Sequence, residues 1–224
     1  MTEAHGRDAY RIPHQIKRCR PALARDIESI VRGPDSGSNP VECVVENGRR
    51  GYPTVRIAGR LAHSSFDPLR EAEKRLRFIE SGTTDRYDGI VIVGFGLGYL
   101  NQALEPAFAD SETKRNRVPT IAVVYSKKEL VAALETRGPS WWCEYGPDRI
   151  VPAWLSGVLP PILRDEGVRR PEVVAIEAIA TGFPDTTELV VQHIDRYRRR
   201  NEVNQNTLRR FGKLWVRNAI RNLA

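Results

Sequence analysis

The stretch Ile90-Val91-Ile92-Val93-Gly94-Phe95-Gly96-Leu97-Gly98-Tyr99-Leu100 decides the expected fold. Its first four residues form a continuous apolar run, which is typical of a strand covered on both faces. The three alternating glycines that follow suit a tight turn into a helix. The amino end of such a helix offers free N–H groups and a partial positive charge to a ligand. The stretch therefore predicts a strand, a glycine turn (residues 94–98) and a helix.

Strands and helices alternate after this stretch. Further apolar runs that suit buried strands lie at Thr120–Val124, Arg149–Val151 and Val173–Ile176. Helical patterns separate them at Leu97–Phe108, at Ser126–Thr136 and, with an interruption, at Ala153–Arg164. A long helix is expected from Asp185-Thr186-Thr187-Glu188 through Arg200 and beyond. This alternation calls for a parallel sheet, so we predict an α/β fold with a Rossmann-like parallel sheet and flanking helices.

Ser126-Lys127-Lys128-Glu129 has the spacing of a capping box. In that motif the first and fourth side chains each satisfy a backbone donor at the start of a helix. Asp67-Pro68 is a second start signal, with Asp67 as the cap and Pro68 as the first helical residue,. We expect one helix to begin at each of these sites.

A small antiparallel element is expected before the main sheet. Val41–Glu46 and Thr54–Ile57 have strand patterns around Asn47-Gly48, a pair that favours hairpins,. The predicted organisation is an amino-terminal arm, partly helical from Pro21 to Arg32 (residues 1–40), a Rossmann-like domain with this hairpin (41–196), and a basic linker helix (197–224).

The charge of the chain is uneven. The formal net charge is +7, and after Tyr197 a single acid, Glu202, accompanies the bases Arg198, Arg199, Arg200, Arg209, Arg210, Lys213, Arg217 and Arg221. Such a tail can be a solvated helix face, or it can bind an acidic partner, an anionic surface or nucleic acid. No apolar run approaches the ~20 residues that span a bilayer. Three cysteines without paired spacing and no signal peptide favour a cytoplasmic protein,.

The ligand of the glycine turn cannot be fixed from these residues. The dinucleotide fingerprint calls for glycine or alanine at the position of Tyr99, and the spacing of S-adenosylmethionine sites fits better,. A carboxylate that could hold a ribose is missing at Tyr125, which ends the next strand,. The candidate cofactor-binding residues are Gly94, Gly96, Gly98 and Tyr125, for S-adenosylmethionine, a nucleotide or no cofactor at all. In the alternative interpretation the glycines only permit close helix–sheet packing.

No catalytic residue or metal ligand is predicted. His63, Ser64 and Asp67 resemble parts of a nucleophile site, but no Gly-x-Ser-x-Gly elbow is present, and helix capping already explains Asp67,. No two histidines share helical or hairpin spacing, which excludes the usual zinc patterns,.

Three stretches resemble segments of the motility-associated-factor (Maf) proteins, bacterial flagellin glycosyltransferases that transfer nonulosonic acids such as pseudaminic or legionaminic acid. Leu61–Ala72 resembles their LHS-aromatic-DP-x-x-EA segment, and Val93–Tyr99 resembles their glycine turn. Arg210–Leu223 is similar to the basic helix that leads into the family's central domain, which is related to hydroxymethylpterin diphosphokinases.

The resemblance, over residues 41–224, implies an accessory amino-terminal domain. In the family the sugar nucleotide binds in the central domain, which would begin just after Ala224. The family often has an acid where Tyr125 stands, a departure that weighs against a nucleotide at this position. The implied partner is the catalytic domain or a separate chain, reached through Arg209–Leu223, with flagellin as a further partner. The alternatives are a methyltransferase-like domain that uses S-adenosylmethionine and a basic module for nucleic acid or an anionic surface, although nucleic acid is the less expected partner.

Overall fold

The computed structural model describes residues 11–33, 42–82, 87–108 and 118–223. Its centre is a four-stranded parallel sheet in the order β6-β5-β4-β7. These strands are β4 (Gly89–Val93), β5 (Thr120–Val124), β6 (Arg149–Pro152) and β7 (Pro171–Ala175). The expected α/β fold with a Rossmann-like parallel sheet is therefore confirmed.

The strand order creates a switch point between β4 and β7. From β4 the chain adds β5 and β6 on one side of the sheet and then crosses to the other side to form β7. In register, Ile92 of β4 lies between Ala122 of β5 and Val174 of β7. Open α/β sheets bind ligands beyond the carboxyl ends of their strands at such a point. The glycine turn, which follows β4, lies at this edge.

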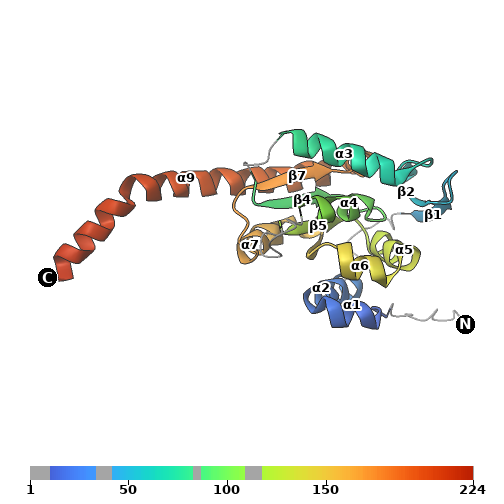
Figure 1. Ribbon diagram of the computed structural model, residues 1–224, viewed down its shortest axis with the longest axis horizontal. Coiled ribbons are helices and arrows are strands. Elements are labelled where there is room, and N and C mark those ends of the chain that lie inside the picture. Colours follow the sequence, from blue (N-terminus) through green and yellow to red (C-terminus); the bar gives the residue numbers. More distant parts are fainter. Residues whose placement is uncertain (1–10, 34–41, 83–86, 109–117, 224) are drawn as a thin grey trace, which may run out of the picture.

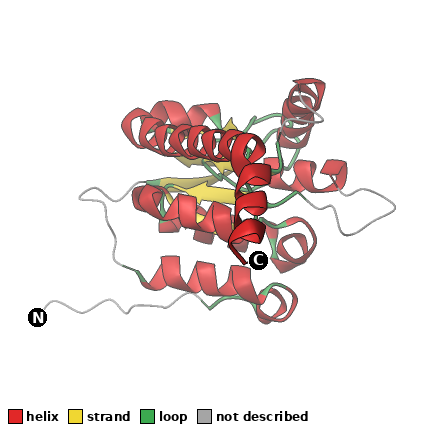
Figure 2. Ribbon diagram, turned by 90° about the vertical axis from the view of Figure 1, so that its left-hand side faces the viewer, coloured by secondary structure: helices red, strands yellow, loops and turns green. Residues whose placement is uncertain are grey.

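Helices lie on both sides of the sheet (Figure 2). Every residue of β4 and β5 is buried, which explains their continuous apolar sequences,. The interrupted helix expected after β6 is confirmed as a 3-10 helix, η1, followed by α7. The flanking elements are α3 (Pro68–Gly82), α4 (Tyr99–Phe108), α5 (Lys127–Arg137), α6 (Pro139–Tyr145), η1 (Ala153–Val158), α7 (Leu159–Asp165) and α8 (Glu177–Gly182).

Two amino-terminal helices belong to the packed body. They are α1 (His14–Cys19) and α2 (Pro21–Arg32), and the bounds of α2 match the sequence prediction. Ile16 and Ile27 are fully buried. At the junction of the two helices the Arg20 guanidinium donates to the carbonyl oxygen of Gly146 at 2.6 Å and lies 3.3 Å from a carboxylate oxygen of Asp148. This contact ties the helix pair to the loop before β6.

A small antiparallel sheet precedes the main one, as expected. Its strands β1 (Cys43–Asn47), β2 (Pro53–Ile57) and β3 (Arg60–Leu61) lie in that order. The sequence did not indicate β3, which is only two residues long. It returns through a tight turn in which Ala58 and Gly59 both have positive φ, 49° and 77°, as hairpin turns of two residues require. Val41, with which the predicted first strand began, lies outside the described residues.

Helix α9 (Pro184–Leu223) begins on the body and ends far from it (Figure 1). Val190 and Ile194 are fully buried one turn apart, and the Asn201 side chain donates to the carbonyl oxygen of Arg169 at 2.9 Å. Beyond Asn201 the helix projects from the sheet, and most of its described side chains are exposed. The expected basic carboxyl-terminal helix is confirmed, although it starts at Pro184 and runs unbroken through residue 197, where a domain boundary was predicted. None of the described helices combines the length and apolar content needed to span a bilayer.

Candidate functional site

The glycine turn adopts the sharp backbone path that its sequence predicts. The φ angles of Gly94, Gly96 and Gly98 are +84°, +58° and +74°. Residues with a side chain rarely adopt such values, so each of these positions favours glycine. The turn connects the carboxyl end of β4 to the first residue of α4, the position at which a dinucleotide or S-adenosylmethionine site would form.

The carboxylate of Glu129 occupies this turn. Its Oε1 atom accepts hydrogen bonds from the amides of Phe95 at 2.8 Å and Gly96 at 2.5 Å. Its Oε2 atom accepts one from the amide of Tyr125 at 2.8 Å. The side chain is completely buried. Because amides of this kind are what a ligand phosphate or carboxylate would use, the chain places a carboxyl group of its own at the expected ligand position.

Glu129 reaches the turn because it is the third residue of α5. Ser126 caps that helix, since its hydroxyl oxygen accepts from the Glu129 amide at 3.0 Å. The capping box predicted from the sequence is thus confirmed, but the Glu129 carboxylate also crosses to the neighbouring loop. The pKa of this carboxyl is raised, because the effect of burial outweighs the hydrogen bonds from the amides of Tyr125, Gly96 and Phe95, which lower it,.

His63 binds the next amide of the turn. Its Nε2 atom accepts a hydrogen bond from the Leu97 amide at 2.8 Å, and its ring meets that of Tyr99 edge-on at 5.0 Å. Burial, followed by the positive charges of Arg137 and Arg75, lowers the pKa of His63 to about 3. The ring is therefore neutral at pH 7, which is the state in which Nε2 can accept a proton donor.

The two remaining amides of the turn are also bonded within the chain. The Gly94 amide donates to the carbonyl oxygen of Val123 at 3.0 Å, and the Gly98 amide donates to that of Phe95 at 3.1 Å. With Glu129 and His63, these bonds satisfy all five N–H groups from residue 94 to residue 98.

Each glycine of the turn also makes room for a neighbouring side chain. An added Cβ would lie 3.0 Å from the side chain of Ile179 at Gly94, 2.2 Å from His63 Nε2 at Gly96, and 2.1 Å from the Trp141 ring at Gly98. Contacts below 3.0 Å are not tolerated without movement. All three glycines therefore permit close packing of a neighbouring side chain, which is the alternative that the sequence left open.

The side chain of Tyr125 is also bound by residues of the same chain. Only 7% of the residue is exposed, its ring stacks on Phe183 at 5.0 Å, and its hydroxyl shares a hydrogen bond with that of Thr187. Burial raises the pKa of the Tyr125 hydroxyl to about 12. The side chain thus lies between α5 and the start of α9 rather than open to solvent.

A small cavity lies next to His63, beside the turn. The cavity that His63 lines with Ala62, Leu100 and Ile176 has a volume of about 20 Å³. This is enough for a single water molecule but far too small for a nucleoside. A cofactor at Gly94, Gly96, Gly98 and Tyr125 would have to displace own-chain groups, and its binding there stays a prediction.

The other candidate residues do not form a reactive site. Asp67 caps α3, accepting from the Arg70 amide at 3.0 Å, and the Ser64 hydroxyl accepts from the Asp67 amide at 3.2 Å. Within the part of the chain that the structure describes, no cluster of three His, Cys, Asp or Glu residues could hold a metal ion.

Cys19 and Cys143 come together although 123 positions separate them in the sequence. Burial, and next a hydrogen bond with the Cys19 thiol, raise the pKa of the Cys143 thiol. No spacing pattern in the sequence could have indicated this pair, because it forms through the packing of α1 on α6.

Comparisons with known proteins assign no family to the chain. No family model matches it, and no solved structure matches it. A protein of Treponema pallidum (strain Nichols), described as uncharacterized, is 27% identical over 192 residues, which make up 83% of this chain and 61% of that protein. The chain therefore spans about three-fifths of the length of this relative.

We expect Glu129→Gln to lower the free energy of unfolding by about 1–3 kcal/mol, because its amide group would present a donor to a buried N–H. Glu129→Ala should cost more, since it leaves three buried amides without an acceptor. Urea unfolding followed by circular dichroism measures both. Glu135→Gln, an exposed change on the same helix, is the control and should stay within about 0.5 kcal/mol of wild type. Equal stability of Glu129→Gln and wild type would contradict the role of this carboxylate.

His63 should make the chain less stable in acid. Its folded pKa of about 3 lies below the ordinary 6.5, so between these values the unfolded chain binds the extra proton. Its contribution is complete above pH 6.5 and falls by about 1.4 kcal/mol per pH unit as the pH drops toward 3.

His63→Gln keeps an acceptor near the position of Nε2 but does not titrate. The difference in unfolding free energy between wild type and this variant should therefore depend on pH, shifting in favour of the variant between pH 6.5 and 4.5. His63→Leu, which removes the acceptor, should be less stable than wild type at pH 7. Parallel pH profiles for wild type and His63→Gln would exclude a buried neutral imidazole.

Proposed function

We propose that this chain is an accessory, non-catalytic domain of a Maf-type flagellin glycosyltransferase, and that α9 docks it to the catalytic domain or to a partner chain. The observation that carries the proposal is the distal segment of α9 (residues 202–223). It projects from the body of the domain (Figure 1), and several of its apolar side chains are exposed.

Apolar side chains are exposed along the distal segment of α9. Leu208, Phe211 and Trp215 share one face at a spacing of three, four and seven residues, and they are 59%, 38% and 51% exposed. The rings of Phe211 and Trp215 stack at 6.3 Å. The Arg210 guanidinium lies 5.4 Å from the centre of the Phe211 ring, and Leu214, on the side of Arg210, is also exposed. A large apolar face on a projecting helix favours burial against another protein surface.

The glycine turn supports a role without chemistry. All of its amides are bonded by Glu129, His63 and neighbouring carbonyl oxygens. A Rossmann-like domain in this state has the fold of a nucleotide-binding unit with its usual anion position already filled. Such a domain can hold other domains in place without binding a cofactor.

The Maf assignment itself comes from the resemblance of Leu61–Ala72, Val93–Tyr99 and Arg210–Leu223 to segments of that family. The greater length of the Treponema relative is compatible with a domain that works beside further sequence. In this proposal the domain acts in the cytoplasm, and flagellin is a second contact of the domain.

Deleting the coding segment for residues 1–224 in the source bacterium tests the function. We expect flagellin to lose the mass of its nonulosonic acid substituents, measured by intact-protein mass spectrometry. Flagellin of unchanged mass would contradict the assignment to this pathway. The purified chain alone should transfer no sugar from a nucleotide-activated nonulosonic acid, and transfer by the chain alone would contradict the accessory role.

Complementation with variants tests the docking helix. The double change Leu208→Ser and Trp215→Ser should fail to restore the flagellin mass, because it removes the centre of the apolar face. The matched control is Leu189→Ser, which removes an apolar side chain that is 45% exposed on the same helix but next to the body, and it should restore the mass. Full restoration by the double variant would exclude this face as the docking surface.

A further inference from the structure

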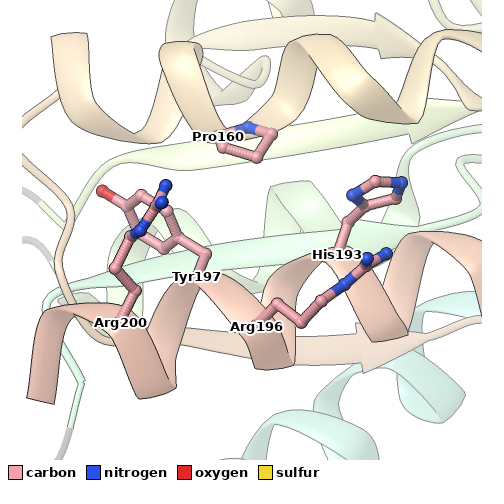
Figure 3. Close-up of a pocket in the computed structure, with 5 residues that line it drawn as sticks. All are labelled: Pro160, His193, Arg196, Tyr197 and Arg200. Atoms are coloured by element: carbon pink, nitrogen blue, oxygen red, sulfur yellow. The ribbon is translucent and has the colours of Figure 1, made fainter. Parts of the chain in front are cut away.

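A groove with a positive charge lies between α9 and α7. Its cavity has a volume of about 390 Å³ and is lined by Pro160, His193, Arg196, Tyr197 and Arg200. Four of these residues come from α9 at a spacing of three, four and seven positions, so they share one face of that helix. Figure 3 shows Pro160, from α7, across the groove from the side chains of α9.

The two arginines of the groove are not used by the fold. Within the described part of the chain neither Arg196 nor Arg200 forms an ion pair, and the Nε atom of Arg196 reaches only the Gln192 carbonyl oxygen of its own helix at 3.3 Å. Arg198, between them in sequence, contrasts with both, because it pairs with Glu172 at 3.2 Å and bonds the carbonyl oxygen of Pro171.

The groove combines this charge with a fixed apolar wall. The Tyr197 hydroxyl donates to the carbonyl oxygen of Val168 at 2.6 Å, which holds the ring in position. Pro160 provides the facing wall, as the second residue of α7. No lining residue is acidic. A cavity of similar volume, about 400 Å³, next to α3 differs on this point, because Asp67 and Glu73 lie among its bases.

We propose that this groove binds a small phosphate ester that carries a planar or apolar group. Arg196 and Arg200 would hold the phosphate, because guanidinium groups bind phosphate oxygens with charge-assisted hydrogen bonds. His193 adds a ring N–H donor, and the planar group lies against Tyr197 and Pro160. The volume lies in the range of small-molecule sites, about 300–1,000 Å³. The site shares no residue with the glycine turn and does not depend on the proposed function.

Titration of the full chain with phenyl phosphate, followed by the shifts of backbone amide signals in NMR spectra, tests the site. We expect saturable shifts centred on residues 193–200 and on Pro160's neighbours in α7. Inorganic phosphate, which lacks the ring, should bind at least threefold more weakly, and phenol, which lacks the charge, should cause no saturable shift.

The variants Arg196→Gln and Arg200→Gln should each weaken phenyl phosphate binding about tenfold or more, as the loss of a hydrogen bond to a charged group predicts. Both side chains are exposed, so unchanged melting curves will show that the fold is intact. Arg77→Gln, in the cavity next to α3, is the matched control and should bind like wild type.

Three results would overturn the proposal. The first is the absence of saturable shifts with phenyl phosphate. The second is an equal loss of binding in Arg77→Gln and the two groove variants, which would indicate unspecific attraction to a basic protein. The third is tight binding of a single-stranded oligonucleotide with a steep salt dependence but no binding of phenyl phosphate, which would assign the arginines to a nucleic-acid surface.

Discussion

The fold depends on one buried carboxylate. Glu129 binds the amides of Phe95 and Gly96 with one oxygen and that of Tyr125 with the other. These amides belong to the loops after two adjacent strands, so a single side chain holds the carboxyl ends of β4 and β5 together. A carboxyl group in the interior is costly unless it is hydrogen-bonded. Here the buried amides need an acceptor and the buried carboxyl group needs donors. Each therefore removes the desolvation cost of the other.

The rest of the domain is arranged around that contact. His63 comes from the segment after the small antiparallel sheet, Trp141 from α6 and Ile179 from α8, and each packs on a different glycine of the turn. The Tyr99 hydroxyl, at the start of α4, donates to the carbonyl oxygen of Pro53 in β2 at 2.7 Å. The edge of the sheet that carries ligands in many α/β proteins is thus covered by parts of the same chain. The glycines are needed for this covering as much as for the turn.

The sequence predicted the parallel sheet well because burial on both faces leaves an unmistakable apolar run at Ile90–Val93 and Thr120–Val124. It also predicted the bounds of α2 and the interrupted helix after β6. It could not predict α6, since Trp141 and Trp142 are buried by tertiary contacts rather than by a helical pattern.

At the candidate site the turn was predicted, but the carboxyl group that occupies it was not. Glu129 was visible only as a helix cap, because sequence spacing within α5 carries no information about a loop 33 residues earlier. The capping box was still the one available signal, since it marks a carboxylate at the start of the helix beside the turn. His63 likewise looked like a fragment of a nucleophile site, whereas its contact with Leu97 spans 34 positions.

The unbroken course of α9 fixes how anything attached to its far end is oriented. From Asn201, which still bonds the body through the Arg169 carbonyl oxygen, to Leu223 the helix extends roughly 30 Å, at 1.5 Å per residue, and it curves without interruption,. A continuous helix fixes both the distance and the rotational orientation of a group at its far end. Adding or removing a single residue would turn the apolar face by about 100° around the axis, whereas three or four residues would nearly restore its direction. If this face docks on a partner, the number of residues between it and the body is therefore constrained by geometry.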